Sequence, residues 1–154
     1  MRKRTLLLAT ALTTGLLTAA LPGTTASAAP SGLSGDFNGD GYADLAIGAS
    51  GENAGAGALT VLYGSASGLR TAGARTITPN TPGIPGSSEK GGRFGARVTL
   101  TRGTGLTVSA PGENSGDGAV WSLRGATASG ATSFGPSATG VPTTGAPNYG
   151  SVLP

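Results

Sequence analysis

The feature that most restricts the fold of this chain is an internal repeat. Residues 45–64 read LAIGASGENAGAGALTVLYG, and residues 106–125 read LTVSAPGENSGDGAVWSLRG. The two stretches align without a gap at an offset of 61 residues, and ten of the twenty aligned positions are identical. A second element recurs as well, since Phe94-Gly95 aligns with Tyr149-Gly150. Units of this size cannot bury their own faces alone, so they stack on their neighbours.

Each repeat consists of short aliphatic and β-branched runs between glycine turns, which is typical of strands. No segment has the apolar spacing of a helix. The expected strands are Asp44 to Ile47, Ala58 to Tyr63, Arg75 to Thr78, Ala96 to Thr101, Leu106 to Ser109 and Ala119 to Leu123. The all-β arrangement that best suits such units is a propeller, in which four-stranded blades stack around an axis.

The N-terminal segment has the three parts of a secretory signal. It begins with Arg2-Lys3-Arg4, continues with an apolar stretch from about Leu6 to Leu21, and ends with the small residues Ala26-Ser27-Ala28. We therefore predict a secreted chain that is cut after Ala28, with no stable membrane insertion afterwards. The alternative is an uncleaved anchor, but the stretch is short and rich in threonine for a spanning helix.

Export would change the charge of the chain. The net charge is +3, from ten Lys and Arg against seven Asp and Glu. Three of the basic residues lie in the predicted signal, so the mature chain would have seven charges of each sign. The remaining basic residues are dispersed, which gives no support to a nucleic-acid groove.

Cysteine and histidine are absent. Without disulfides, a bound metal becomes a plausible staple for a small exported domain. Without histidine, the chain lacks the usual general base of hydrolases and the commonest zinc ligand. There is also no Gly-x-Ser-x-Gly nucleophile motif. We therefore expect no catalytic residues and no enzymatic activity.

Three segments carry a resemblance to a known family: DFNGDGYADLAIGAS (residues 36–50), RFGARV (93–98) and LTVSAPGEN (106–114). They resemble the FG-GAP repeat of integrin alpha-chain β-propellers and of many secreted bacterial proteins. The resemblance covers roughly residues 34–153. It implies an all-β fold, here about two four-stranded blades of an incomplete propeller, whose family members usually close a ring of seven blades. It also implies that the aspartate-rich segment is a calcium loop joining two strands of one blade.

The spacing of that segment suits Ca²⁺. Ligands are expected at positions 1, 3, 5, 7 and 9 of the loop, and a glycine at position 6 permits a sharp turn. The expected ligands are the side chains of Asp36, Asn38, Asp40 and Asp44 and the backbone carbonyl of Tyr42. They supply about six hard oxygens, and water completes the six to eight that calcium takes. Such donors exclude zinc and copper. The alternative is a metal-free turn held by Asn and Asp side chains.

An EF-hand or a dockerin fails at position 12 of the loop, which requires glutamate and is Ile47 here. Residues 45–48 also predict a buried strand where those families have a helix. In the second repeat the carboxylate loop is replaced by Arg102-Gly103-Thr104-Gly105 and is shorter by about five residues. One calcium site is therefore expected. Arg102 could supply a charge in place of the metal, but a solvated turn is favoured.

Two other features are open to two interpretations. The shared stretches Gly51-Glu52-Asn53 and Gly112-Glu113-Asn114 are either a ligand surface or hairpin turns, and turn chemistry is favoured. Trp121, which aligns with Thr60, is either an inter-blade core residue or an exposed aromatic for sugar stacking. Core packing is the favoured role.

The expected organisation is a signal peptide at 1–28, a short linker at 29–34 and an FG-GAP region at 35–154. Repeat 1 spans about 35–90, repeat 2 about 91–147, and a third begins at 148–154. The first blade lacks a Phe-Gly strand and the chain ends within a motif, so truncation is favoured over assembly of several copies or pairing with another chain. Open sheet edges would invite self-association.

The expected function is that of a secreted calcium-binding module. The resemblance implies that calcium is structural and that the module binds or adheres to an extracellular protein or glycan, which the sequence leaves unknown. A fragment of a larger secreted propeller protein or propeller-bearing hydrolase, without activity of its own, is the alternative. A non-functional remnant with a working export signal is a third.

Overall fold

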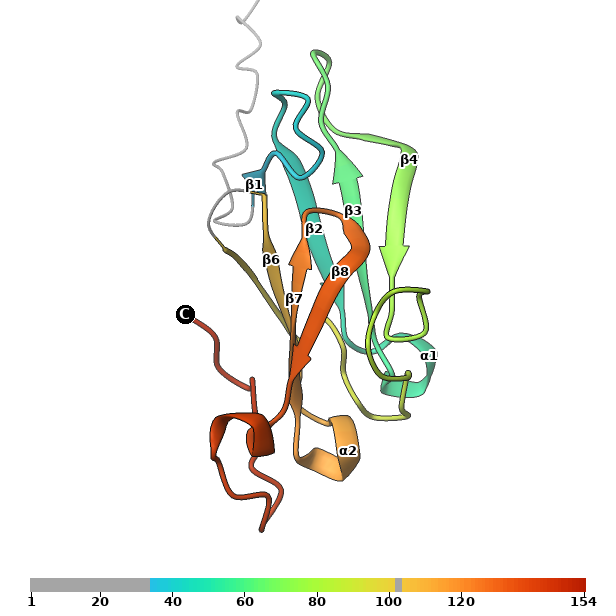
Figure 1. Cartoon of the computed structure of the whole chain (residues 1–154). Coiled ribbons are helices and arrows are strands. Elements are labelled where there is room, and N and C mark those ends of the chain that lie inside the picture. Colours follow the sequence, from blue (N-terminus) through green and yellow to red (C-terminus); the bar gives the residue numbers. More distant parts are fainter. Residues whose placement is uncertain (1–33, 102–103) are drawn as a thin grey trace, which may run out of the picture.

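The computed structural model of the chain describes residues 34–101 and 104–154 (Figure 1). The described residues form two four-stranded antiparallel sheets, each with its strands in chain order. This confirms the predicted all-β fold with two blades. The expected signal peptide at 1–28 and Arg102 lie outside the described residues. None of the helices in the described ranges is long and apolar enough to cross a membrane.

The first sheet contains β1 (Ser34–Gly35), β2 (Asp44–Ala49), β3 (Ala58–Tyr63) and β4 (Arg70–Ile77). The second contains β5 (Arg97–Leu100), β6 (Leu106–Ala110), β7 (Ala119–Arg124) and β8 (Thr127–Phe134). The bounds of β3 match the prediction, and β2, β5, β6 and β7 differ from it by one or two residues at an end. The expected strand Arg75 to Thr78 overlaps the last part of β4, which begins five residues earlier and ends at Ile77. β1 and β8 were not predicted.

The two unpredicted strands lack the usual sequence signals. β1 has only two residues, yet it takes the place in the first sheet that β5 has in the second. β8 reads TASGATSF, and its residues are exposed or half-buried, because it forms an edge of its sheet. Small polar residues on an edge strand carry no hydrophobic alternation, and their pairing depends on the neighbouring strand.

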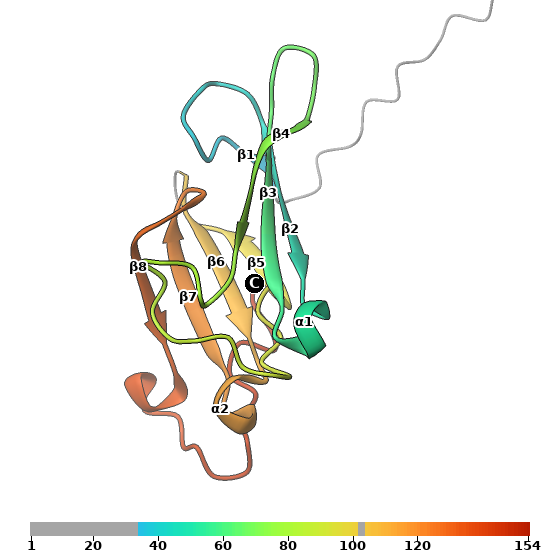
Figure 2. The same cartoon turned by 90° about the vertical axis from the view of Figure 1, so that its right-hand side faces the viewer.

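The internal repeat is visible in the backbone. The pairing of β3 with β4 shifts register between Val61 and Tyr63, and the pairing of β7 with β8 shifts between Ser122 and Arg124, which is the same place in each repeat. The β2–β3 and β6–β7 connections are the single turns α1 (Glu52–Gly55) and α2 (Glu113–Gly116). Both turns lie at the same end of the sheets, opposite the β1–β2 loop (Figures 1 and 2).

The conformation of these turns explains the shared Gly-Glu-Asn stretches. Asn53 and Asn114 both adopt a left-handed backbone conformation, with φ of 50° and 53°. Asparagine tolerates this conformation better than most residues. The predicted turn role of these stretches is therefore confirmed. A 3₁₀ turn, η1 (Pro136–Thr139), follows β8.

One hydrophobic cluster runs through both sheets. Trp121 lies within it, is 2% exposed, and packs edge-to-face on Phe94 with ring centroids 5.2 Å apart. Its predicted core role is confirmed. The predicted strand at residues 45–48 is confirmed as part of β2, but its predicted burial is wrong at Ile47, which is 41% exposed. Side chains alternate across a strand, and in β2 Asp44 and Ala46 face the core while their neighbours face outward.

The segment that opens each repeat docks on the preceding blade. The Arg93 and Phe94 amides donate to carbonyls of residues 55 and 56, and the Asn148 and Tyr149 amides donate to those of residues 116 and 117, at 2.8 to 2.9 Å. Phe94 and Tyr149 are therefore equivalent. Gly95 follows with φ of 83°, and a Cβ there would lie 2.5 Å from the carbonyl oxygen of Ala58. The close approach of two backbones thus requires glycine after Phe94.

Candidate functional site

The predicted metal ligands lie in and beside the loop that joins β1 to β2. Asp36 organises the first half of this loop. Its Oδ1 accepts hydrogen bonds from the amides of Gly39 at 2.6 Å and Asp40 at 3.1 Å, and its Oδ2 accepts one from Gly41 at 2.8 Å. Gly39 and Gly41 have φ of 79° and 88°, which lets the chain curl around the carboxylate.

Asn38 and Asp40 complete a small polar network in the same loop. The Asn38 side-chain amide donates to Oδ2 of Asp40 at 2.8 Å, and Oδ1 of Asp40 accepts from the Tyr42 amide at 3.0 Å. These two bonds, the backbone one first, hold the pKa of the Asp40 carboxyl below its usual value. The Asn38 and Asp40 side chains are both exposed.

Asp44 has a different environment. It is 1% exposed, and its two oxygens accept backbone hydrogen bonds from Phe37 at 2.7 Å and from Gly64 at 2.8 Å. Phe37 is at the start of the loop, and Gly64 directly follows β3. The Asp44 carboxylate therefore ties the loop to the end of the third strand, a role that its position in the sequence does not reveal.

The structure thus brings together three of the five expected ligands, Asp36, Asn38 and Asp40. The Tyr42 side chain is 44% exposed, and the Tyr42 backbone amide donates to Asp40. Both oxygens of Asp44 already accept hydrogen bonds from backbone amides. Among the described residues, no group of three or more Asp, Glu, His or Cys side chains could hold a metal ion. The three loop side chains still fit a hard cation, because a carboxylate has about four acceptor positions and those of Asp40 are only partly used.

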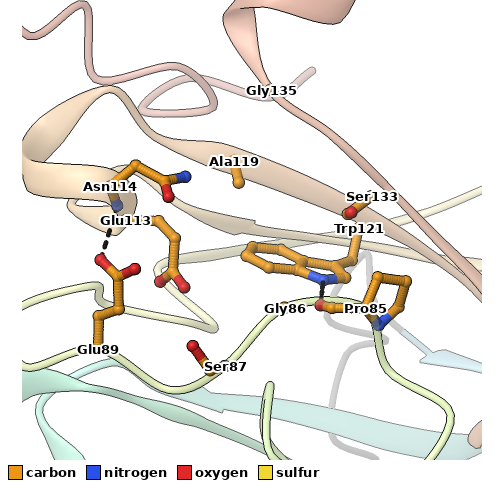
Figure 3. Close-up of a pocket in the computed structure, with 10 residues that line it drawn as sticks. All are labelled: Pro85, Gly86, Ser87, Glu89, Glu113, Asn114, Ala119, Trp121, Ser133 and Gly135. Carbon is orange, nitrogen blue, oxygen red and sulfur yellow. Dashed lines mark hydrogen bonds between the residues drawn. The ribbon is translucent and has the colours of Figure 1, made fainter.

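A second acidic site lies on the other blade, in the Gly112-Glu113-Asn114 stretch for which the sequence favoured a turn over a ligand surface. Glu113 of α2 is 4% exposed, and its Oε2 has no hydrogen-bond partner among the described residues. Glu89 lies nearby and accepts a hydrogen bond from the Asn114 amide at 2.8 Å. Both glutamates line a cavity with Trp121 (Figure 3). No sequence signal separates Glu113 from Glu52, because the second repeat shares its Gly-Glu-Asn stretch with the first.

Comparison with known proteins agrees with the repeat architecture. The family model described as FG-GAP repeat matches residues 28–62, which include the Asp36 loop, β2, α1 and nearly all of β3. No curated protein and no solved structure matches the chain. The match and the two repeated four-stranded sheets indicate a propeller-type module of the kind found in extracellular proteins. Residues 28–62 therefore carry an FG-GAP repeat.

Proposed function

We propose that this chain is a secreted, calcium-stabilised FG-GAP module that binds an extracellular protein or glycan. The observation that carries the proposal is the β1–β2 loop. In this loop the side-chain oxygens of Asp36 and Asn38 both accept from the Asp40 amide, and the Asn38 side-chain amide donates to the Asp40 carboxylate. Two carboxylates in one short loop repel each other, and a divalent cation removes that repulsion.

In this proposal calcium has a structural role. Asp36, Asn38 and Asp40 hold the ion with their side-chain oxygens, the Tyr42 carbonyl and water supply further ligands, and Asp44 keeps the loop anchored to Gly64. The bound ion stiffens an exposed loop at the end of the blade. Loops presented by a rigid sheet scaffold are the usual place for partner binding.

The test is a thermal melt of the full chain, followed by circular dichroism, in about 5 mM Ca²⁺ and then in chelator. Extracellular calcium modules bind at about 10⁻⁴ to 10⁻³ M. At ten times the dissociation constant, binding adds roughly 1.4 kcal/mol of stability, or a rise in Tm of about 5 °C. We expect Asp40→Ala to abolish this calcium-dependent rise.

Asp117→Ala is the matched control. Asp117 is a half-buried aspartate at the end of α2, outside the loop, so its substitution should leave the calcium response intact. Only the calcium-dependent increment is compared, since Asp40→Ala also removes a hydrogen bond from the metal-free loop. A melt that is the same in calcium and in chelator, or equal calcium responses of the two variants, would refute the proposed site.

A further inference from the structure

The cavity on the second blade is lined on one side by two acidic residues, Glu89 and Glu113. Its volume is about 190 Å³, and it lies between the segment 85–89 and the residues of α2, β7 and β8 (Figure 3). One part of its lining is apolar, with Pro85, Ala119 and Trp121, and the other part carries Glu89 and Glu113. A cavity of about 150 Å³ is large enough for benzene, so this one has room for a ligand of similar size or slightly larger.

Glu113 is the residue of the cavity that most strongly indicates a bound ligand. Its carboxylate is buried, and Oε2 has no partner among the described residues. Gly92 packs directly on it, since a Cβ at that position would clash with Oε2. A buried carboxylate without a positive partner is costly. Burial, with a further contribution from Glu89, raises the pKa of Glu113 to about 7.

The other polar groups that line the cavity limit which kind of ligand it can bind. Glu89 gives one oxygen to the Asn114 amide, which leaves acceptor capacity on its carboxylate. The Trp121 indole N–H is already used, because it donates to the Pro85 carbonyl at 2.8 Å. The tryptophan therefore offers only its ring. Two carboxylates and an aromatic ring repel an anion and attract a cation.

We propose that this cavity binds a primary ammonium group on a short unbranched alkyl chain, as in a free alkylamine or a lysine side chain. The ammonium has three N–H donors, and Glu113, Glu89 and the Ser87 hydroxyl supply acceptors at the cavity wall. The methylene groups lie against Pro85 and Trp121. A calcium ion fits less well, because two carboxylates fall short of the six to eight oxygens that it takes.

Trp121 makes the proposal directly measurable. It is the single tryptophan of the chain, so its fluorescence reports on this cavity. We propose a titration of the full chain with n-butylammonium chloride, in chelator, at about pH 8.5, where Glu113 is ionised and the amine is still protonated. We expect a saturable change in fluorescence. Butan-1-ol, which lacks the charge, should bind at least about tenfold more weakly.

The variants form a matched pair from the two repeats. Glu113→Gln keeps the shape of the side chain and removes its charge, so butylammonium affinity should fall at least about tenfold. Glu52→Gln makes the same change at the equivalent position of the first repeat, where the side chain is exposed, and should leave affinity unchanged. Circular dichroism checks the fold of both variants. Because the assay contains chelator, its result is independent of the calcium proposal.

Several results would overturn this assignment: no saturable response up to about 0.1 M butylammonium, equal affinity in Glu113→Gln, or equal binding of butan-1-ol. A tryptophan response to calcium, in a titration without chelator, with no response to butylammonium would overturn it too. A parallel titration with a blocked lysine distinguishes the source of the group. Tighter binding of blocked lysine than of butylammonium indicates a lysine side chain, and the reverse order indicates a free amine.

Discussion

Replacing Asp44 by asparagine should destabilise this protein whether or not calcium is present. The wild-type carboxylate is 1% exposed and accepts two backbone hydrogen bonds, from Phe37 at 2.7 Å and Gly64 at 2.8 Å. A hydrogen bond to a charged group contributes about 1.5 to 3 kcal/mol. Asparagine has one carbonyl oxygen, so it keeps one of these bonds and turns its NH₂ group toward the other amide.

The expected loss follows from that geometry. One charged bond disappears and one buried N–H is left without an acceptor, so Asp44→Asn should lower the free energy of unfolding by about 2 to 4 kcal/mol. Asp44→Ala removes both bonds and should cost about 3 to 6 kcal/mol. Asp40→Asn in chelator is the control, because its carboxyl is fully exposed and no metal is then bound to it. Surface changes of that kind usually alter stability by about 0.5 kcal/mol or less.

The assay is urea unfolding followed by circular dichroism and by Trp121 fluorescence, in calcium and in chelator. Circular dichroism reports on both sheets, and Trp121 reports on the core shared by them. The loss in Asp44→Asn should be the same in both buffers if Asp44 is an anchor of the loop. A loss below about 1 kcal/mol in chelator, or a loss that appears only in calcium, would refute this reasoning and make Asp44 primarily a metal ligand.

Two further predictions concern the second repeat and the contact between the blades. The raised pKa of Glu113 means that the folded chain keeps this proton at pH values where the unfolded chain has lost it, so stability should fall as pH rises from 4.5 to about 7. This rise in the Glu113 pKa corresponds to roughly 3 kcal/mol of stability, or about 2 after allowance for solvent at the cavity mouth. Glu113→Gln should remove this contribution from the pH dependence of the urea midpoint, and an unchanged pH dependence in the variant would contradict the prediction. Gly95→Ala should cost more than about 3 kcal/mol in the same assay, because its Cβ meets the Ala58 carbonyl at a φ of 83°. Gly73→Ala, at a φ of 80° with nothing within 4 Å of the added Cβ, should cost only about 1 to 2 kcal/mol, and equal losses in the two variants would show that the contact between backbones does not matter.

The parts of the fold that could be predicted from sequence are those governed by local chemistry. β3 and β7 consist of aliphatic residues between glycine turns, and the Gly-Glu-Asn stretches have residues that tolerate left-handed backbone. Because the same stretches recur after 61 residues, the same pair of strands recurs as well. β8 could not be predicted in this way, since its small polar residues form a strand only through pairing with β7.

The candidate metal site likewise has one part that follows from local sequence and one part that depends on tertiary contacts. Asp36, Asn38 and Asp40 are close in sequence, and Gly39 and Gly41 let one tight turn curl around the Asp36 carboxylate. Their grouping is therefore a local property that spacing alone indicates. The role of Asp44 depends on Gly64, twenty residues away, and on the packing that buries both. No spacing rule indicates such a contact.

Glu52 and Glu113 show most directly what the sequence determines and what it leaves to the tertiary structure. They occupy the same position of the same repeated stretch, and the turns that follow them have the same conformation. The sequence by itself determined this shared backbone, because Gly and Asn set the dihedral angles. Only the tertiary structure decided that Glu52 is exposed and that Glu113 is buried beside a cavity. The physical reason is that the chain around Glu89 and Gly92 folds over the second turn, and burial depends on which distant segment covers a residue.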